Sequence, residues 1–365
     1  MALKNLSKKF GTVIAVDDVT IEISRGELVT LLGPSGCGKT TILRMISGLI
    51  QPSRGMIEIF GRDVTQLETW DRNCGFVFQS YALFPHMNVF ENIAYGLKIR
   101  KWSKDRIRQK MDEISNLLQI DELLQRNPKE LSGGQQQRVA IARALSIEPD
   151  LLLMDEPLAN LDAKLREVIR FELRRIQQET GITTIYVTHD QSEAFAMSDR
   201  IVVLSEGKVE QIGTPQEIFT TPASEFVASF IGNNNLLYGT ISSIEYDEAQ
   251  VDWGEFLFKG RMIKNLQPGI NAVVSIRAED FELLEKLNSI TPINKYPEPN
   301  IIVGKISGMI YLGNVYRLNL YTNSGNIFVE LPVIDTKEYK LDQEDNIKLR
   351  AINVQIIDMK NKNDR

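Results

Sequence analysis

The stretch that decides the fold is ELVTLLGPSGCGKTTILRMISGL, residues 27–49. Residues 27–32 form an apolar run of the kind found in buried parallel strands. The glycine-rich turn from Gly33 to Thr41 matches the pattern G-x-x-x-x-G-K-[ST] and leads into a helical pattern that ends near Gly48. A strand, this turn and a helix in that order predict a loop whose backbone N–H groups bind the phosphates of a nucleotide.

The side chains of this loop suit separate tasks. Lys39 is a mobile cation for the β and γ phosphates, and the hydroxyl of Thr40 suits Mg²⁺, which prefers oxygen ligands. Glycine lets the backbone approach the phosphates closely. We therefore expect ATP and Mg²⁺ to bind here. The predicted nucleotide-binding positions are Gly33, Ser35, Gly36, Cys37, Gly38, Lys39, Thr40 and Thr41.

Two carboxylates follow another apolar strand pattern, LLLMD at residues 151–155. Asp155 ends that pattern, where a carboxylate beside a phosphate-binding loop can hold the metal ion. Glu156 is the next residue, and we predict that it orients or deprotonates the attacking water. A structural acid stabilised by the dipole at a helix start is the alternative.

A second glycine-rich helix start lies in LSGGQQQR, residues 131–138. Ser132 can cap the following helix, and Gly133 and Gly134 leave its first N–H groups open to an anion. The loop has no lysine to grip a phosphate and no metal ligand. It therefore predicts half of a binding site, which a second copy of the chain would complete.

The spacing of apolar runs divides the chain into two predicted domains. Residues 1–232 alternate strands and helices, which predicts an α/β domain with a mostly parallel sheet and a helical subdomain at about 85–150. Residues 233–360 contain many short alternating segments, which predict an antiparallel β domain, a small barrel or sandwich. A loop is expected over 288–300 and a polar tail at the end.

The composition excludes several classes of protein. A net charge of -6 argues against a dedicated nucleic-acid binder. Cys37 and Cys74 are expected to be reduced thiols of a cytoplasmic protein. The first residues lack the apolar core of a secretory signal, and no apolar run has the length of a membrane span. Work at a membrane would need another chain to span it.

With these motifs in order, the chain resembles the ABC-type ATPases. LSGGQ, placed before the strand LLLMDEP, looks like their signature motif. GFVFQ, ANLD and TTIYVTHD look like their Q-loop, D-loop and switch motif, and the resemblance runs through residues 1–235. In that family two subunits meet head to tail, and each ATP lies between the phosphate loop of one copy and the signature of the other.

The resemblance implies roles for further residues. Gln79 would touch the metal and sense the γ-phosphate, and His189 would contact that phosphate. Phe10 occupies the position of the aromatic that stacks on adenine. Asp162 matches the D-loop, where the family often has a serine in place of Ala159. The implied catalytic residues are Glu156, His189 and Gln79, the metal ligands Thr40, Gln79 and Asp155, and the positions completing the second copy's site Ser132, Gly133, Gly134, Gln135 and Asp162.

The second half resembles the OB-like (TOBE) accessory domain of one importer branch, through SIRAED at 275–280 and YLG at 311–313. The family usually has Val-Arg-Pro-Glu at the first position, whereas this chain has Ala278 instead of proline. The resemblance implies a homodimer at the cytoplasmic face of the membrane, bound to permease subunits near residues 80–98 and served indirectly by an extracytoplasmic solute-binding protein. The expected cargo is a polyamine, ferric iron, sulfate or phosphonate.

Two other functions remain as alternatives. A DNA-maintenance ATPase shares the signature motif, but that class inserts long coiled coils before it, and this chain shows no sustained heptads there. A small-molecule kinase shares the phosphate loop. It has no need of the signature, and a glutamate after the metal aspartate would waste its ATP.

Overall fold

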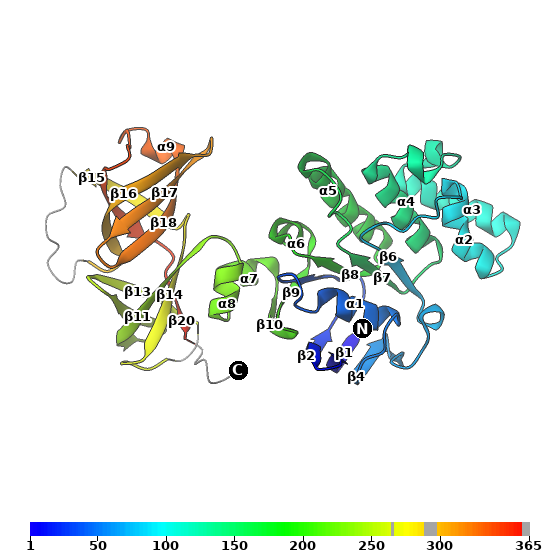
Figure 1. The fold of residues 1–365 in the computed structure, drawn as a ribbon, viewed down its shortest axis with the longest axis horizontal. Helices are drawn as coiled ribbons and strands as arrows, with labels where there is room; N and C mark the ends of the chain where they lie inside the picture. The colour runs from blue at the N-terminus through cyan, green and yellow to red at the C-terminus, as the bar shows by residue number, and fades with distance from the viewer. Residues whose placement is uncertain (264–265, 288–297, 360–365) are drawn as a thin grey trace. The chain divides into compact units, whose positions relative to one another are not determined.

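The computed structural model describes residues 1–263, 266–287 and 298–359. The chain divides into two compact units, Met1–Gln216 and Glu217–Arg365, whose elements are labelled in Figure 1. Most of the expected loop over 288–300, residue 360 of the expected second domain and the polar tail lie outside the described residues. Within the described part of the chain, no helix combines the length and the apolar character needed to cross a membrane.

The first unit is built on a six-stranded sheet in the order β10-β9-β3-β8-β7-β6. All pairs are parallel except β10 with β9. The strands β3, β7 and β8 are buried along their whole length, as their continuous apolar sequence predicts. Parallel strands end at the same edge, so the loops that follow them converge there. The bounds are β3 Leu28–Leu32, β6 Cys74–Val77, β7 Leu151–Asp155, β8 Thr183–Thr188, β9 Arg200–Ser205 and β10 Lys208–Gly213.

A smaller antiparallel sheet in the order β2-β1-β4-β5 belongs to the same unit. The sequence analysis did not predict it. The β1–β2 pairing carries several register shifts, and these break the simple alternation by which a half-buried strand is recognised. The bounds are β1 Ala2–Phe10, β2 Val13–Glu22, β4 Arg54–Ile59 and β5 Arg62–Asp63.

Helices cover the parallel sheet, and several begin at a capping side chain. The helix expected after the phosphate loop is α1, which ends at Gly48 in the left-handed conformation. The expected helical subdomain contains α2, α3 and α4, whose buried faces share one apolar core with Ile93, Leu97 and Met111. The bounds are α1 Lys39–Ser47, α2 Val89–Ile99, α3 Lys104–Leu118, α4 Gly133–Ser146, α5 Ala163–Thr180 and α6 Gln191–Met197.

The second unit confirms the predicted all-β domain and adds a sheet to it. Strands β11-β12-β13-β20-β14 close into a barrel, and β15-β19-β16-β17-β18 form a five-stranded sheet. Apolar residues of both sheets form one core. The bounds are β11 Asn234–Glu245, β12 Glu248–Trp253, β13 Phe256–Met262, β14 Asn271–Arg277, β15 Phe281–Leu287, β16 Ile301–Tyr311, β17 Val315–Thr322, β18 Gly325–Pro332, α9 Val333–Thr336, β19 Asn346–Ala351 and β20 Gln355–Asp358.

The second unit begins at Glu217, before the domain boundary predicted at residue 232. The buried Arg277 binds the segment between these two positions. Its guanidinium donates to the backbone carbonyls of Phe219 and Ile231 and lies 3.5 Å from the centre of the Phe219 ring. These contacts fasten α7 (Pro215–Thr220) and the end of α8 (Glu225–Phe230) to the barrel strand β14. At the position where the family usually has proline, the N–H of Ala278 donates to the carbonyl of Asn233 over 2.8 Å, a bond that proline cannot make.

Candidate functional site

The phosphate loop lies between β3 and α1, as the sequence predicts. Gly36 and Gly38 have φ values of 82° and 102°, the left-handed region that favours glycine. A Cβ added at Gly38 would come within 2.5 Å of the carbonyl oxygen of Ala15, so space as well as conformation requires glycine there. Gly38 is the N-cap of α1, so the first N–H groups of the helix face the loop.

Lys39 is buried, with only 5% of its surface exposed. Its Nζ donates to the carbonyls of Gly33 and Pro34 at 2.6 and 2.8 Å. Cys37 beside it is a buried free thiol, and burial raises its pKa, so the thiol is neutral at physiological pH. Cys74 is also free, and burial raises its pKa to about 12. The loop therefore offers a phosphate chain one ammonium group, held by two carbonyls, and a set of backbone donors.

Thr40 and Asp155 form an oxygen-donor pair at the end of β7. Thr40 Oγ1 donates to Asp155 Oδ1 over 2.9 Å, and Asp155 is 7% exposed. The described residues contain no cluster of three or more His, Cys, Asp or Glu side chains able to hold a metal. Mg²⁺ needs no such cluster, because it binds through one or two protein oxygens together with phosphates and waters. The pair therefore fits this ion.

Asp155→Asn is expected to raise the free energy of unfolding at neutral pH, because burial raises the pKa of the native carboxyl. The unfolded chain then loses this proton at a lower pH than the native protein, so stability falls as the pH rises between the two pKa values. At pH values below that interval, Asp155→Asn and wild type should have similar free energies of unfolding. Thermal unfolding of nucleotide-free protein from acidic to neutral pH measures it. A variant that is less stable than wild type at neutral pH would contradict the desolvation argument.

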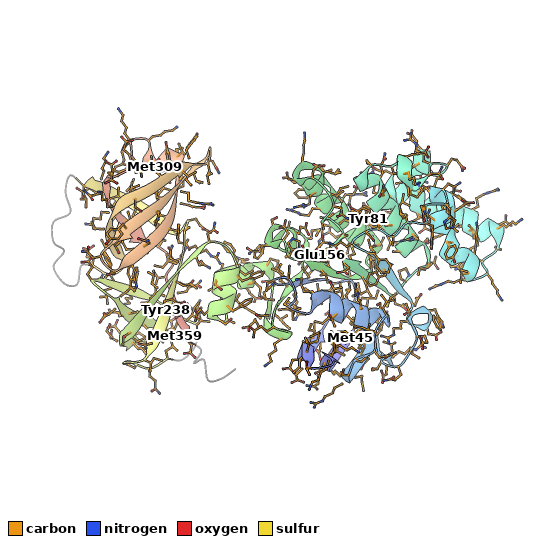
Figure 2. All side chains as sticks on the ribbon, viewed as in Figure 1. Met45, Tyr81, Glu156, Tyr238, Met309 and Met359 are labelled. Atoms are coloured by element: carbon orange, nitrogen blue, oxygen red, sulfur yellow. The ribbon has the colours of Figure 1, made fainter. Side chains whose placement is uncertain are left out.

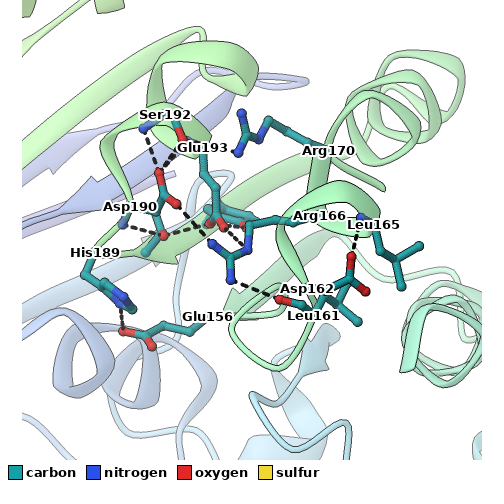
Figure 3. Close-up of polar contacts among 12 residues, drawn as sticks. Glu156, Leu161, Asp162, Leu165, Arg166, Arg170, His189, Asp190, Ser192 and Glu193 are labelled. Atoms are coloured by element: carbon teal, nitrogen blue, oxygen red, sulfur yellow. Dashed lines mark hydrogen bonds and ion pairs between the residues drawn. The ribbon is translucent and has the colours of Figure 1, made fainter. Parts of the chain in front are cut away.

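Three neighbouring strands bring the predicted catalytic residues together. Gln79 follows β6, Glu156 follows β7 and His189 follows β8. Glu156 Oε1 lies 3.2 Å from His189 Nδ1, and Gln79 Nε2 donates to Glu156 Oε2 over 3.3 Å. Figure 3 shows the imidazole directed at the carboxylate, and Figure 2 shows Glu156 within the first unit. The side chain of Gln79 therefore binds Glu156, and its role as a metal ligand stays a prediction.

The backbone around Glu156 is itself constrained. Its φ of 44° lies in the left-handed region, and its N–H donates to the carbonyl of Val187 over 3.0 Å. Non-glycine residues hold this conformation only where the surrounding structure imposes it, and such positions gather at active sites. Asn160, which sequence reasoning missed, donates from Nδ2 to the carbonyl of Gln79 over 2.8 Å. The only signal in the sequence was a polar residue between two leucines, Leu158 and Leu161. The structure shows both leucines buried.

A polar network behind His189 also went unpredicted. Arg166 of α5 donates to the carbonyl of Leu161 over 3.0 Å and forms an ion pair with Asp190 at 3.5 Å (Figure 3). Asp190 caps α6, and the buried Glu193 accepts hydrogen bonds from the hydroxyls of Tyr186 and Thr188. The network connects the end of the ANLD segment with the residue after His189. It lies among residues far apart in sequence, so local patterns gave no sign of it.

The signature segment confirms the predicted cap. Ser132 accepts from the N–H of Gln135, and the Gln135 side chain accepts from the N–H of Ser132, which closes a capping box at the start of α4. A Cβ at Gly133 would come within 2.9 Å of Leu161, so packing also favours glycine there. Among the residues that the structure describes, no hydrogen bond or ion pair joins Ser132–Gln135 to the phosphate loop. The assignment of this segment to a site shared with a second copy stays a prediction.

The remaining predicted positions lie at the surface. Phe10 ends β1, is 49% exposed and has Lys8 Nζ 5.0 Å from its ring centre. Asp162 caps α5 by accepting from the N–H of Leu165 over 3.0 Å. In the region predicted to dock a permease, Phe84 lies against the partly exposed Tyr95, with ring centres 4.8 Å apart. All three assignments stay predictions.

Known proteins match most of the chain. The ABC transporter family matches residues 16–159. A spermidine/putrescine import ATP-binding protein of Thermobifida fusca is 44% identical over 319 residues, which cover 86% of this chain and 81% of that protein. An Fe(3+) ions import ATP-binding protein of Rhizobium meliloti is 44% identical over 338 residues, which cover 92% of this chain and 91% of that protein. The dimeric post-hydrolysis structure of the ATP-binding cassette MJ0796 bound to ADP and Pi is 36% identical, covers 59% of this chain and 98% of that chain, and has a TM-score of 0.52.

Proposed function

This chain belongs to the ATP-binding subunits of ABC importers, and from this premise we propose how it hydrolyses ATP, what it assembles with and what it imports. It is an ATPase whose conversion of ATP and water to ADP and phosphate is coupled to transport. The observation that carries the proposed mechanism is the position of Glu156, held between Gln79 and His189 at the sheet edge that also presents the phosphate loop.

The residues divide the chemistry between them. The phosphate loop and Lys39 bind the β and γ phosphates, while Thr40 and Asp155 hold Mg²⁺. The ion supplies positive charge that stabilises negative charge on the phosphates. Glu156 orients the attacking water and takes up its proton. His189 and Gln79 hold the carboxylate of Glu156, and with nucleotide bound His189 would contact the γ-phosphate and Gln79 the metal ion. Phe10 stacks on the adenine.

A second copy of the chain completes each site. Ser132, Gly133, Gly134 and Gln135 present a helix start that has no lysine, and no described hydrogen bond or ion pair connects them to the phosphate loop of their own chain. In a head-to-tail homodimer this helix start, together with Asp162, closes over the nucleotide of the partner. The closed dimer binds ATP more tightly than the open one, and this difference drives the cycle.

Import ATP-binding subunits work with membrane permease subunits. We place the contact near residues 80–98, which follow Gln79, so a change at the γ-phosphate reaches the permease through this segment. The protein would then act peripherally at the cytoplasmic face, with the solute-binding protein on the other side. The matched relatives carry names for spermidine/putrescine and for Fe(3+). Other relatives carry names for sulfate/thiosulfate import. A polyamine, ferric iron or sulfate is therefore the proposed cargo, ahead of a phosphonate.

An assay of the purified protein tests this function. ATPase activity should rise more steeply than linearly with protein concentration, because each site needs two copies. Phosphate transfer to an added acceptor alcohol would instead indicate a kinase. In cells that lack this chain, uptake of labelled spermidine and of ferric iron should be compared with uptake of sulfate. Unchanged uptake of all three would remove the proposed cargo.

Lys39→Ala is expected to weaken ATP binding by about 10- to 100-fold, since a hydrogen bond to a charged group contributes roughly 1.5–3 kcal/mol. The fluorescence of a labelled ATP analogue measures the affinity. Lys4→Ala is a matched control, because Lys4 is a cation of the same unit that lies outside the loop and forms an ion pair with Glu58 over 2.9 Å. Equal affinity of Lys39→Ala and wild type would contradict the assignment of the loop.

A further inference from the structure

The segment that follows Gln79 has an unusual backbone. Tyr81 and Ala82 are consecutive non-glycine residues with φ values of 61° and 47°. Residues with a Cβ rarely adopt this region and keep it only where neighbouring groups hold them there. The segment leads directly from Gln79 into α2. A strained conformation at this place indicates that neighbouring groups hold the segment.

One side chain holds both strained residues. Arg143 Nη2 donates to the carbonyl of Tyr81 and Nη1 donates to the carbonyl of Ala82, each over 2.7 Å. The guanidinium carbon also lies 5.6 Å from the ring centre of Phe84. Because the guanidinium is planar and its donors have fixed directions, two bonds of this kind set the orientation of two successive carbonyls together.

The charge of Arg143 has no other evident use. Among the described residues it forms no ion pair, and burial lowers its pKa. A partly buried cation without a carboxylate is unfavourable unless other groups solvate it, and here the two carbonyls and the aromatic ring do so. The side chain of Tyr81 is 4% exposed, and Asn92 of α2 binds both the N–H and the carbonyl of Phe84. The segment is thus fixed from α2 on one side and from α4 on the other.

The helix that carries Arg143 is the one that begins at the signature. Arg143 lies in the last turn of α4, whose first residue is Gly133. At the other end of the contact, Gln79 binds Glu156 through its side chain and Asn160 through its carbonyl. A displacement of α4 is therefore transmitted through two hydrogen bonds to the residues next to Gln79. Figure 2 shows Tyr81 and Glu156 in the same unit.

We propose that Arg143 is a positioning residue that clamps residues 80–84 in their strained conformation and couples the position of the signature helix to Gln79 and Glu156. Its described hydrogen bonds go to the backbone carbonyls of Tyr81 and Ala82 and to no residue of the phosphate loop. This inference rests on the proposed function, because the coupling matters only if α4 closes over a nucleotide bound by another copy. Loss of the clamp lets the segment relax and leaves Glu156 without its neighbour in place.

Arg143→Ala should lower kcat for ATP hydrolysis about tenfold or more, which corresponds to about 1.4 kcal/mol in the barrier. The KM for ATP should stay within about a factor of two, because the described hydrogen bonds of Arg143 go to residues 81 and 82 and not to the phosphate loop. Arg143→Lys keeps the charge but not the paired donors, so its kcat should lie between those of wild type and Arg143→Ala. Arg106→Ala is the matched control on helix α3, since Arg106 lies over the ring of Trp102 and forms an ion pair with Glu148 at 3.3 Å but binds no strained carbonyl.

The decisive variant is Ala82→Gly in the Arg143→Ala background. Glycine adopts a φ of 47° without strain, so it should recover at least about a third of the lost activity if the task of Arg143 is to hold that conformation. A purely structural role for Arg143 would leave the double variant as slow as the single one, and that result would overturn the clamp. A kcat for Arg143→Ala equal to that of wild type would also overturn the clamp.

Hydrogen–deuterium exchange gives a readout that does not depend on hydrolysis. The amides of residues 78–84 should exchange faster in Arg143→Ala than in wild type or Arg106→Ala. The double variant Arg143→Ala/Ala82→Gly should also exchange faster than wild type. Equal exchange in all variants would refute the clamp. If wild type shows no ATPase activity, the proposed function fails, whereas the exchange comparison still decides whether Arg143 holds the segment.

Discussion

Glu156→Gln is expected to lower ATP turnover by about 10²- to 10⁴-fold, the range that general-base catalysis contributes. The glutamine keeps the size of the side chain, and its amide can still meet Gln79 and His189 at the distances seen for the carboxylate. It cannot accept the proton of water. ATP binding should persist, because the phosphate loop and the Thr40–Asp155 pair are untouched. Nucleotide-loaded protein should therefore accumulate as a dimer.

Single-turnover hydrolysis and size measurement by light scattering with Mg²⁺ and ATP check this result. Glu245→Gln is a suitable control, because it makes the same chemical change at an exposed carboxylate of the second unit. Turnover at the wild-type rate would remove Glu156 as the base. A nucleotide-loaded variant that stays monomeric at high concentration, with and without its permease, would remove the shared site.

Ser132→Arg is expected to lower turnover by about 100-fold or more while ATP still binds to the separate chain. Loss of one oriented contact at a site that must close to within hydrogen-bonding distance accounts for an effect of that size. The long cation would occupy the helix start that the partner's phosphates must approach. The defect should appear only in the dimer, so the Glu156→Gln variant should no longer dimerise when Ser132→Arg is added.

The change also removes a helix cap, which costs about 1 kcal/mol of stability, and that effect needs its own control. Ser103→Arg provides it, because Ser103 caps α3 in the same way by accepting from the N–H of Arg106. Both variants lose a cap and gain an arginine, but only one faces the proposed partner site. Similar activity in the two variants would contradict a composite site, whereas a difference in turnover at similar thermal stability supports it.

The sequence by itself determined those features that depend on a few consecutive residues. Glycines at left-handed positions, an apolar strand before them and a helix after them specify the phosphate loop, and Ser132 with Gln135 specifies a capped helix start. The same local logic predicted the buried strands β3, β7 and β8 and an all-β second domain. It failed for the sheet that contains β1 and β2, whose register shifts hide the alternation.

Only the tertiary structure decided which of these pieces meet. Gln79, Glu156 and His189 come together because β6, β7 and β8 are neighbours in the sheet, and strand order cannot be read from residues that are far apart in the chain. Asn160, Arg166 and Arg143 act on backbone carbonyls, which every residue has, so no sequence pattern marks their partners. The contacts of Arg277 with Phe219 and Ile231 likewise join residues far apart in the chain.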